Sequence, residues 1–545
     1  MCRMRLIQKI ILVLLLPIIG ICDEDKRLHI YSPVPGLEPS KHYSFKIRSQ
    51  GSSEWKEMFA FVTTCKSGGI TNGVTANAYY WRLDKWSNTY VNFEILENAP
   101  IEIEISKLDG QPITSAVARP SHCVETCKVI NGKAYVYLDK PALFSVDING
   151  QMEEQNTGRI NMKGWGNESF YSGPPIHTLT IFANPVIKDK PSKKDPKVLC
   201  VIPGQIPSSE GDWDIMYFLP GVHDIGACFR VHANKSYYIP GDALVYGTFN
   251  NEKMGSDGHN IRIYGHGTLS GERIPHPDCD IPVALEKDYW KYKPIDIRGA
   301  HNTKVEGITI VDSAMHSLML ISEYNPQKPT DICWVKIFTW RRNGDGINPF
   351  GNGLIEDCFI RTQDDCVYVN GRGIRRVVFW TDANGSAFVL SPIGNMQKQL
   401  LGNNIIVEDC DIIYSRSIFN THKGGRVFNL RGAGRGAGGD NIIFRNIKVT
   451  DPRPTRSAFG ILSAAPWQRH PNYEQSRGEG EIRNILFQNI DINARSIIGD
   501  HETLWGTKIA PIKGFIFDNV TISEELIDDI NDFNHNNYVE DIKFR

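Results

Sequence analysis

Short runs in which apolar and polar residues alternate, separated by turn residues, follow one another between residues 28 and 183. Runs with a period of two are typical of half-buried β-strands, and their regular spacing predicts an all-β sandwich. A charged, proline-containing segment at residues 187–196 then reads as a linker. We therefore predict an N-terminal β-sandwich over residues 23–196 and place the domain boundary near residue 197. The six clearest runs are Lys41–Arg48, Tyr90–Leu96, Ile101–Leu108, Lys133–Leu138, Leu143–Ile148 and His177–Phe182.

The second part of the chain repeats one pattern of apolar, polar, small or Asx, apolar, polar and apolar positions. Its period of two and its Ile, Val and Phe content favour strands over a helical solenoid. One copy has too few apolar residues to bury alone, whereas stacked copies share a continuous core. Residues 197–545 are therefore expected to form a right-handed parallel β-helix. The copies are Val305–Ile310, Val335–Trp340, Ile355–Ile360, Val407–Ile412, Phe444–Val449, Phe487–Ile492 and Phe517–Ile522.

The Asx residue within the copies has a structural interpretation. Asn and Asp tolerate unusual backbone angles and bind exposed amides, so they suit the tight corners of a coil. We expect corner positions at Asp357, Asp409, Asn446, Asn489 and Asn519.

Two acidic clusters interrupt the repeat, one containing Asp345 and the other Asp364 and Asp365. Asp364 follows Asp345 by 19 residues, close to the shortest repeat spacing, which separates Val335 from Ile355. The clusters should therefore occupy the same position on neighbouring coils, whose strands lie about 4.8 Å apart. Carboxyl groups one or two rungs apart suit hydrolysis of a glycosidic bond, which needs a protonated acid and a carboxylate that activates water or attacks the sugar.

Other interpretations of these clusters remain open at this stage. Asp-Gly and Asp-Asp pairs are common in turns, and their oxygen atoms are ligands that Ca²⁺ prefers. A calcium-dependent polysaccharide lyase, with an arginine such as Arg341 as base, is a further alternative. Adjacent residues of a regular strand point to opposite faces, so Asp364 and Asp365 can share a groove only at a bend or bulge.

Aromatic and basic residues on or near the acidic coils are candidates for substrate binding. Trp340, Tyr368 and Trp380 could stack on sugar rings, although aromatic residues at alternating positions are as often part of a core. Lys423 lies in a basic segment that ends at Arg426, and Arg341 and Arg342 form another. Such cations could bind an acidic sugar, pair with the aspartates or simply face solvent.

The N-terminus and the overall composition indicate where the protein works. Arg3, Arg5 and Lys9 precede a short apolar run, so residues 1–22 are expected to be a secretory signal peptide and not a membrane anchor. The net charge is −2 and no block of basic residues occurs, so we expect no nucleic-acid partner. The mature protein is predicted to be secreted, free of membranes and monomeric.

Cysteines and sequons agree with export. Of the 12 cysteines, two fall in or beside the signal, which leaves an even number, as an oxidising compartment favours. Cys123–Cys127 and Cys358–Cys366 are candidate disulfide bonds because of their short spacing, whereas the cysteine pattern does not suit zinc. No metal and no cofactor are expected. Asn-x-Ser/Thr sequons, which predict a glycoprotein, occur at Asn167, Asn234, Asn384 and Asn519.

Three motifs in their order along the chain resemble glycoside hydrolase family 49, the dextranases and isopullulanases. They are His266–Glu272 (HGTLSGE), Gly344–Gly346 (GDG) and Thr362–Asp365 (TQDD), and Phe182–Pro185 (FANP) also looks familiar near the boundary. The resemblance covers nearly the whole mature chain. It implies a β-sandwich followed by a right-handed β-helix, and endo-hydrolysis of α-glucan such as dextran or pullulan with inversion.

The resemblance also implies roles for individual residues. Asp364 would be the general acid, while Asp345 and Asp365 would hold and activate the water. Two positions depart from the family pattern: Gly344 stands where Thr is usual, and Cys366 stands where Gly is usual. Asp-Asp-Cys is more like the polygalacturonases of family 28, so hydrolysis of an acidic polysaccharide is an alternative. A non-catalytic carbohydrate-binding β-helix is another.

Overall fold

The computed structural model describes residues 28–64, 87–152, 156–159, 170–173, 175, 177–251, 258–274, 292–322, 325, 327–340, 343–382, 385–390, 403–415, 426–431, 439–451, 459–462, 481–493 and 502–545. The expected signal peptide, Asn167, Asn384 and Lys423 lie outside this range. Among the described residues, no helix is long and apolar enough to cross a membrane.

The N-terminal domain is a sandwich of two mainly antiparallel sheets, which enclose a core of their inward Ile, Val and Phe side chains. All six predicted runs are strands here. One sheet contains β1 (Leu28–Ile30), β4 (Phe61–Thr64), β5 (Ser87–Ile95), β7 (Ala116–Arg119), β10 (Ala142–Ile148) and β13 (Thr178–Pro185). The other contains β2 (Tyr43–Ser49), β3 (Lys56–Met58), β6 (Ile101–Lys107), β8 (Thr126–Ile130) and β9 (Lys133–Leu138). A hairpin of β11 (Asn156–Arg159) and β12 (Phe170–Gly173) and the 3₁₀ turn Ser121–Cys123 complete it.

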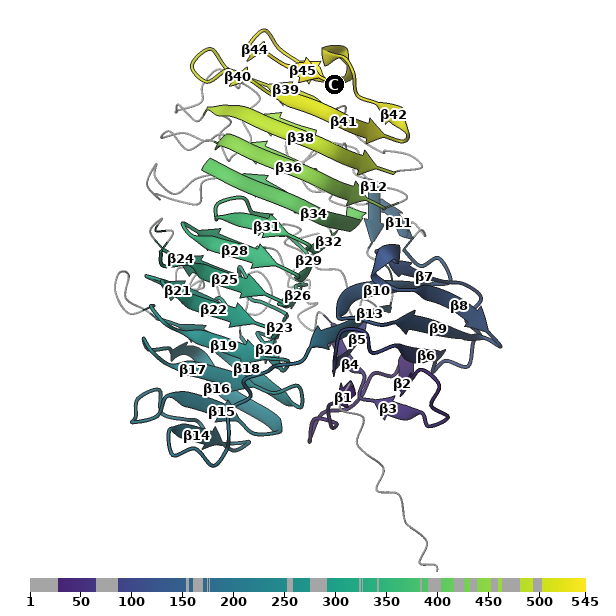
Figure 1. Cartoon of the computed structure of the whole chain (residues 1–545), viewed down its shortest axis with the longest axis vertical. Helices are drawn as coiled ribbons and strands as arrows, with labels where there is room; N and C mark the ends of the chain where they lie inside the picture. The colour runs from purple at the N-terminus through teal and green to yellow at the C-terminus, as the bar shows by residue number, and fades with distance from the viewer. Residues whose placement is uncertain are drawn as a thin grey trace, which may run out of the picture.

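The C-terminal domain is a parallel β-helix, a tall stack in Figure 1 with β14 at one end and β45 at the other. Three sheets run along it. The first contains β14 (Val198–Val201), β15 (Ile215–Phe218), β17 (Ser236–Ile239), β19 (Arg262–Gly265), β22 (Thr303–Glu306), β25 (Thr330–Cys333), β28 (Gly353–Glu356) and β31 (Gly373–Arg375). The second contains β16 (Gly221–Arg230), β18 (Ala243–Asn250), β20 (Thr268–Ser270), β23 (Thr309–Val311), β26 (Lys336–Phe338), β29 (Phe359–Thr362) and β32 (Val378–Thr381).

The third sheet contains β21 (Ile295–Arg298), β24 (Leu318–Ile321), β27 (Ile347–Phe350), β30 (Val367–Tyr368), β33 (Phe388–Leu390), β35 (Phe428–Arg431), β37 (Phe459–Leu462) and β39 (Thr503–Trp505). Farther along, single long strands continue the first and second sheets: β34 (Asn403–Ser415), β36 (Gly439–Val449), β38 (Ile482–Ile492) and β41 (Ile516–Ile522). The end is closed by β40 (Ile512–Lys513), β42 (Glu525–Leu526), β43 (Asn534–His535), β44 (Val539–Glu540), β45 (Lys543–Phe544) and the 3₁₀ turn Ile530–Asp532. The predicted fold class, a β-sandwich followed by a parallel β-helix, is confirmed. The exact boundary near residue 197 stays a prediction; β13 ends at Pro185 and β14 begins at Val198.

The expected corner residues are confirmed. All five have a left-handed backbone, with φ between 52° and 55°. Four of them also bind one another along the stack: the amide of Asn519 donates to Asn489, that of Asn489 to Asn446, and that of Asn446 to Asp409, at 2.9–3.1 Å. Asx side chains thus fit both the local strain and the repeat between coils.

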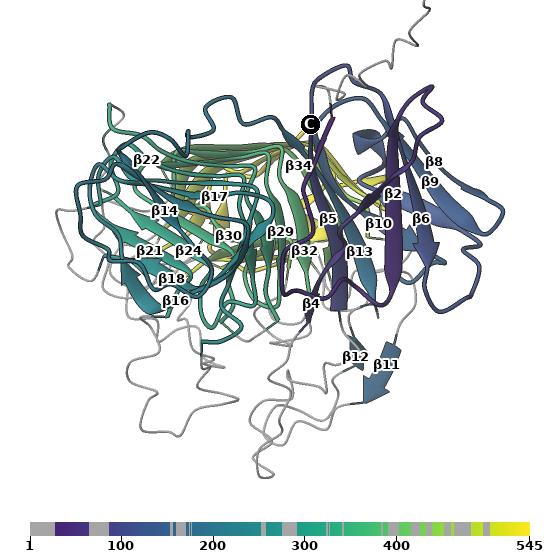
Figure 2. The same cartoon turned by 90° about the horizontal axis from the view of Figure 1, so that it is seen from below.

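The sandwich packs against the outer face of the second sheet (Figure 2). Phe61, Tyr90 and Phe182 of the sandwich form one buried cluster with Phe338 and Phe359 of the β-helix. This contact covers the part of the β-helix that carries β26, β29 and β32. Outward-facing residues of the second sheet are therefore buried there.

The two disulfide bonds expected from spacing are not formed, because all eight described cysteines are free thiols. Cys358 and Cys366 precede two successive strands of one coil, so they lie at different corners of the core. Cys366 instead contacts the Thr362 hydroxyl at 3.0 Å. Cys123 ends a 3₁₀ turn, and burial raises its pKa to about 12, which keeps the thiol protonated.

Candidate active site

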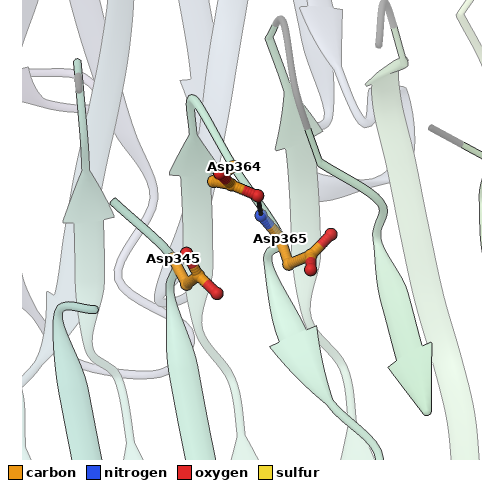
Figure 3. A group of neighbouring side chains, drawn as sticks. All are labelled: Asp345, Asp364 and Asp365. Carbon is orange, nitrogen blue, oxygen red and sulfur yellow. Dashed lines mark hydrogen bonds between the residues drawn. The ribbon is translucent and has the colours of Figure 1, made fainter. Parts of the chain in front are cut away.

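The three predicted aspartates occupy neighbouring turns between the second and third sheets. Asp345 lies between β26 and β27, and Asp364 and Asp365 lie between β29 and β30. β26 pairs with β29 and β27 pairs with β30, so the two turns are adjacent in the stack. One carboxylate oxygen from each residue lies within 4.8 Å of the others (Figure 3).

The turn at 363–366 explains how adjacent residues reach one site. These residues are not in a strand, so the alternation of side chains is broken between β29 and β30. The Thr362 hydroxyl donates to the Asp364 carbonyl at 2.5 Å and fixes the bend. A Cβ on Gly346 would overlap the Cys366 carbonyl, so the turn that carries Asp345 must have glycine at this position.

Backbone amides hold two of the carboxyl groups. The Asp364 carboxylate accepts the Asn343 N–H at 3.0 Å and the Asp365 N–H at 2.9 Å, the second of which is drawn in Figure 3. The Asp365 carboxylate accepts the Ser386 N–H at 3.0 Å, from the turn of the next coil. The three side chains are almost fully buried, with 4–7% of each residue exposed.

The Tyr368 hydroxyl contacts both Asp345 and Asp365. Its hydroxyl lies 2.5 Å from Asp345 Oδ2 and 3.4 Å from Asp365 Oδ2. These two carboxylates therefore share one polar contact, and Asp364 is not part of it. Burial and the neighbouring aspartates raise the pKa of the Tyr368 hydroxyl well above its ordinary value, so it stays a donor.

Burial, followed by the charges of Asp364 and Asp365, raises the pKa of Asp345 well above its ordinary value, and the Tyr368 hydrogen bond opposes this rise. The resemblance implies that Asp364 is the general acid, and this role stays a prediction. Three carboxyl groups this close titrate as one coupled set, which retains a proton that an isolated aspartate would lose.

His316 is a residue of the site that the sequence analysis did not single out. It lies in the turn before β24, one coil before Asp345, and its Nδ1 is 3.4 Å from Asp345 Oδ2. Burial, with Lys293 as the next cause, lowers the pKa of His316 to about 3, so its ring is neutral at ordinary pH. The offset of 29 residues from Asp345 nearly equals the 30 residues between two repeat copies, and this register could have revealed it.

Two of the predicted substrate-binding aromatics do not face the site. Trp380 is fully buried between Arg361, 4.1 Å from its ring, and Tyr414, which stacks on it. Trp340 is 2% exposed, and its indole N–H donates to Thr63 of the sandwich at 2.9 Å. Their predicted stacking on sugar rings is therefore wrong, because the sandwich covers this face. Tyr368 is also buried and contacts the aspartates through its hydroxyl, so its ring offers no platform either.

The same three carboxylates are the described residues that could together hold a metal ion. Oxygen ligands would suit Ca²⁺ or Mg²⁺. The arrangement is equally suited to acid and base catalysis, because it combines a retained proton with ionised neighbours in a nearly dry site.

Comparison with known proteins supports the fold. No protein-family model matches the sequence, and no curated protein matches it. The structure is similar to Dex49A from Penicillium minioluteum, with a TM-score of 0.71 and 16% identity over 96% of this chain and 97% of that chain. This likeness spans both domains and confirms the fold that the sequence resemblance implies.

Two β-helix proteins match less well. A family 28 exopolygalacturonase from Yersinia enterocolitica has a TM-score of 0.37 and 14% identity over 82% of this chain and 97% of that chain. A polygalacturonase from Erwinia carotovora ssp. carotovora has a TM-score of 0.38 and 14% identity over 61% of this chain and 89% of that chain. Scores of this size are too low to support an argument about function.

Proposed function

We propose that the protein is a glycoside hydrolase that cleaves α-glucan within the chain, with dextran or pullulan as the substrate type. The observation that carries the proposal is the group of three buried carboxyl groups whose oxygens lie within 4.8 Å on adjacent turns. The sequence motifs and the likeness to Dex49A support the same function. No cofactor is needed for this chemistry.

In this proposal Asp364 donates a proton to the glycosidic oxygen. Asp345 and Asp365 hold the attacking water, and Asp345 or Asp365 takes its proton. Both carboxylates contact the Tyr368 hydroxyl, which supports a common role for Asp345 and Asp365 in holding the water. The backbone amides of Asn343 and Asp365 hold the Asp364 carboxylate in a separate orientation.

The stereochemical outcome has two candidates. The proposed mechanism inverts the anomeric carbon, because water attacks opposite the leaving group. However, the nearest oxygens lie closer than the roughly 6.5–9.5 Å that separates the carboxyl groups of most inverting enzymes. A retaining mechanism, in which one aspartate attacks the sugar, is therefore the alternative to be tested. Proton NMR of fresh product from an α-linked substrate distinguishes them: the β-anomer appears first with inversion and the α-anomer first with retention.

The charges near the site support a neutral substrate. Lys293 and Arg298, on coils before Asp345, are both paired with Asp296 at 2.6–3.0 Å. A uronate would have to compete with that carboxylate for the two cations. These two cations therefore give the alternative of an acidic polysaccharide little support.

A substrate screen tests the function. The purified protein is incubated with dextran, pullulan and polygalacturonate, and reducing ends are measured with and without EDTA. We expect saturated products from dextran or pullulan and no effect of EDTA. Cleavage of polygalacturonate alone would favour the family 28 alternative. Unsaturated products that no longer form when EDTA is added would show a lyase. Binding of polysaccharide without release of reducing ends would show a non-catalytic carbohydrate-binding protein.

We also propose that the protein is secreted as a monomeric glycoprotein. The expected signal peptide at residues 1–22 and an acidic mature chain support export. Two of the four sequons lie within the described residues, and both Asn234 and Asn519 are exposed.

Replacing Tyr368 with phenylalanine should shift the acid limb of the pH profile. Asp345 must be ionised to accept a proton, so activity falls as the pH drops through its pKa. The Tyr368 hydrogen bond lowers that pKa, and its loss should move the acid limb to higher pH. We also expect kcat to fall about tenfold, as for loss of one hydrogen bond to a charged group. Tyr264→Phe, at a buried tyrosine of the first sheet, is the control and should leave the profile unchanged.

A further inference from the structure

Arg361 is a charged residue inside the contact between the two domains. It lies on β29, three residues before Asp364, and it is completely buried. Its neighbours in the second sheet, Phe338 and Trp380, are apolar, as expected for a face covered by the sandwich. A buried guanidinium is costly unless it is paired, so its partners indicate why it is there.

The partners of Arg361 come from both domains. Its Nε donates to the Asp382 carboxylate at 3.0 Å, within the β-helix. Its Nη1 donates to the Thr178 hydroxyl at 2.7 Å and lies 3.4 Å from the Asn88 side-chain oxygen, both in the sandwich. The rings of Trp340 and Trp380 lie 4.7 and 4.1 Å from the guanidinium carbon. One planar side chain therefore connects two sandwich strands to one turn of the β-helix.

That turn supports the catalytic aspartates. Asp382 follows β32, and its N–H donates to the Thr362 carbonyl at 2.8 Å. A Cβ on Gly385 would overlap the Asp364 carbonyl and the Asp365 nitrogen, so Gly385 lies directly against this peptide. Ser386 donates its N–H to the Asp365 carboxylate and accepts the Cys366 N–H at 2.8 Å. We call Asp382, Gly385 and Ser386 the supporting turn.

We propose that the β-sandwich positions the catalytic aspartates through Arg361, which ties Thr178 and Asn88 to the supporting turn. Arg361, Asp382 and Thr178 are then positioning residues, and the sandwich is part of the catalytic machinery. The inference rests on the proposed function, since it assigns these residues to the same site.

The ion pair of Arg361 and Asp382 is better suited to positioning the turn than to stabilising the fold. Burying two charges gains little net stability, because the desolvation cost offsets their attraction. Arginine has a rigid fork that fixes direction as well as distance, which a lysine ammonium does not. The indole N–H of Trp380 donates to the other oxygen of Asp382 at 2.8 Å, so the carboxylate is held from two sides. Small errors in position are expensive in catalysis, about 100-fold for 1 Å.

The first test alters only the sandwich side. Thr178→Val keeps the shape of the side chain and removes the hydroxyl that accepts from Arg361. We expect kcat on dextran to fall about tenfold, with KM unchanged within about twofold, because substrate contacts are intact. Tyr90→Phe is the matched control: it lies on the neighbouring strand β5 and loses another buried bond between the domains, to Thr268 at 2.9 Å, far along the stack from the supporting turn.

The second test alters the ion pair without leaving a buried charge. The double variant Arg361→Gln with Asp382→Asn keeps a neutral hydrogen-bonding pair, and we expect kcat to fall about 100-fold. Hydrogen exchange of the segment 362–369 provides a readout that needs no activity. It should be faster in both test variants than in the wild type and in Tyr90→Phe.

The outcomes separate this inference from the proposed function. If the wild type cleaves no polysaccharide, the proposed function fails, and hydrogen exchange alone decides the inference. Faster exchange at 362–369 only in the Thr178 and Arg361/Asp382 variants supports it. Exchange equal to that of Tyr90→Phe, or kcat values equal to that control, overturns it.

Discussion

Asp364→Asn should lower the turnover of dextran or pullulan by about 10²–10⁴-fold, the contribution of a general acid. Asparagine has the same shape, and its side-chain oxygen can still accept one of the Asn343 and Asp365 N–H groups, which bind different oxygens of Asp364, so the fold should be kept. Without a proton to donate, the enzyme cannot help an alkoxide leave. The loss should therefore be large on polysaccharide and small on an α-glycosyl fluoride, whose leaving group needs no proton.

The control for this experiment is Asp409→Asn. Asp409 is a corner residue that accepts from the amide of Asn446, and asparagine fills the corresponding corners of the next coils. The substitution removes one carboxylate far from the site and keeps the ladder, so activity should not change. Activity like that of the wild type in Asp364→Asn, or an equal loss on fluoride and polysaccharide, would remove Asp364 from the role of acid.

The parts of the fold that repeat were predictable from the sequence. A corner such as Asn446 needs a left-handed backbone on every coil, so the same residue types recur at a fixed position. The carboxylates were predictable for the same reason. Asp345 and Asp364 are one coil apart in sequence, and the register between β26 and β29 brings their turns together.

The parts that depend on contact between distant segments were not predictable. The sequence left open whether Trp340 and Trp380 bind sugar or belong to a core, because only the docking of the sandwich decides that they are buried. The same limit applies to Cys358 and Cys366, because spacing does not show that a corner separates them. The sequence did not single out Arg361, because its partners Thr178 and Asn88 lie far away in the sequence.

Asp345→Asn should strongly lower activity and stabilise the fold, a combination that separates a catalytic carboxylate from a structural one. In the wild type, burial and the charges of Asp364 and Asp365 raise the pKa of the Asp345 carboxyl, so its ionised form is disfavoured in the folded state. The folded protein binds a proton that the unfolded chain releases once the pH exceeds the ordinary value of 3.8. Stability of the wild type therefore falls as the pH rises through the window between that value and the raised pKa.

The asparagine variant lacks this titration, because its side chain is neutral at every pH. Its melting temperature should equal that of the wild type near pH 4 and exceed it by about 1–3 °C at pH 7, the scale expected for a large domain. Turnover should fall about 10²–10⁴-fold on polysaccharide and, unlike that of Asp364→Asn, equally on the glycosyl fluoride, because the water still needs a base. Thermal unfolding at several pH values and fluoride release measure the two effects. A lower melting temperature at pH 7, or full activity on the fluoride, would show that Asp345 is a structural group and not the residue that activates water.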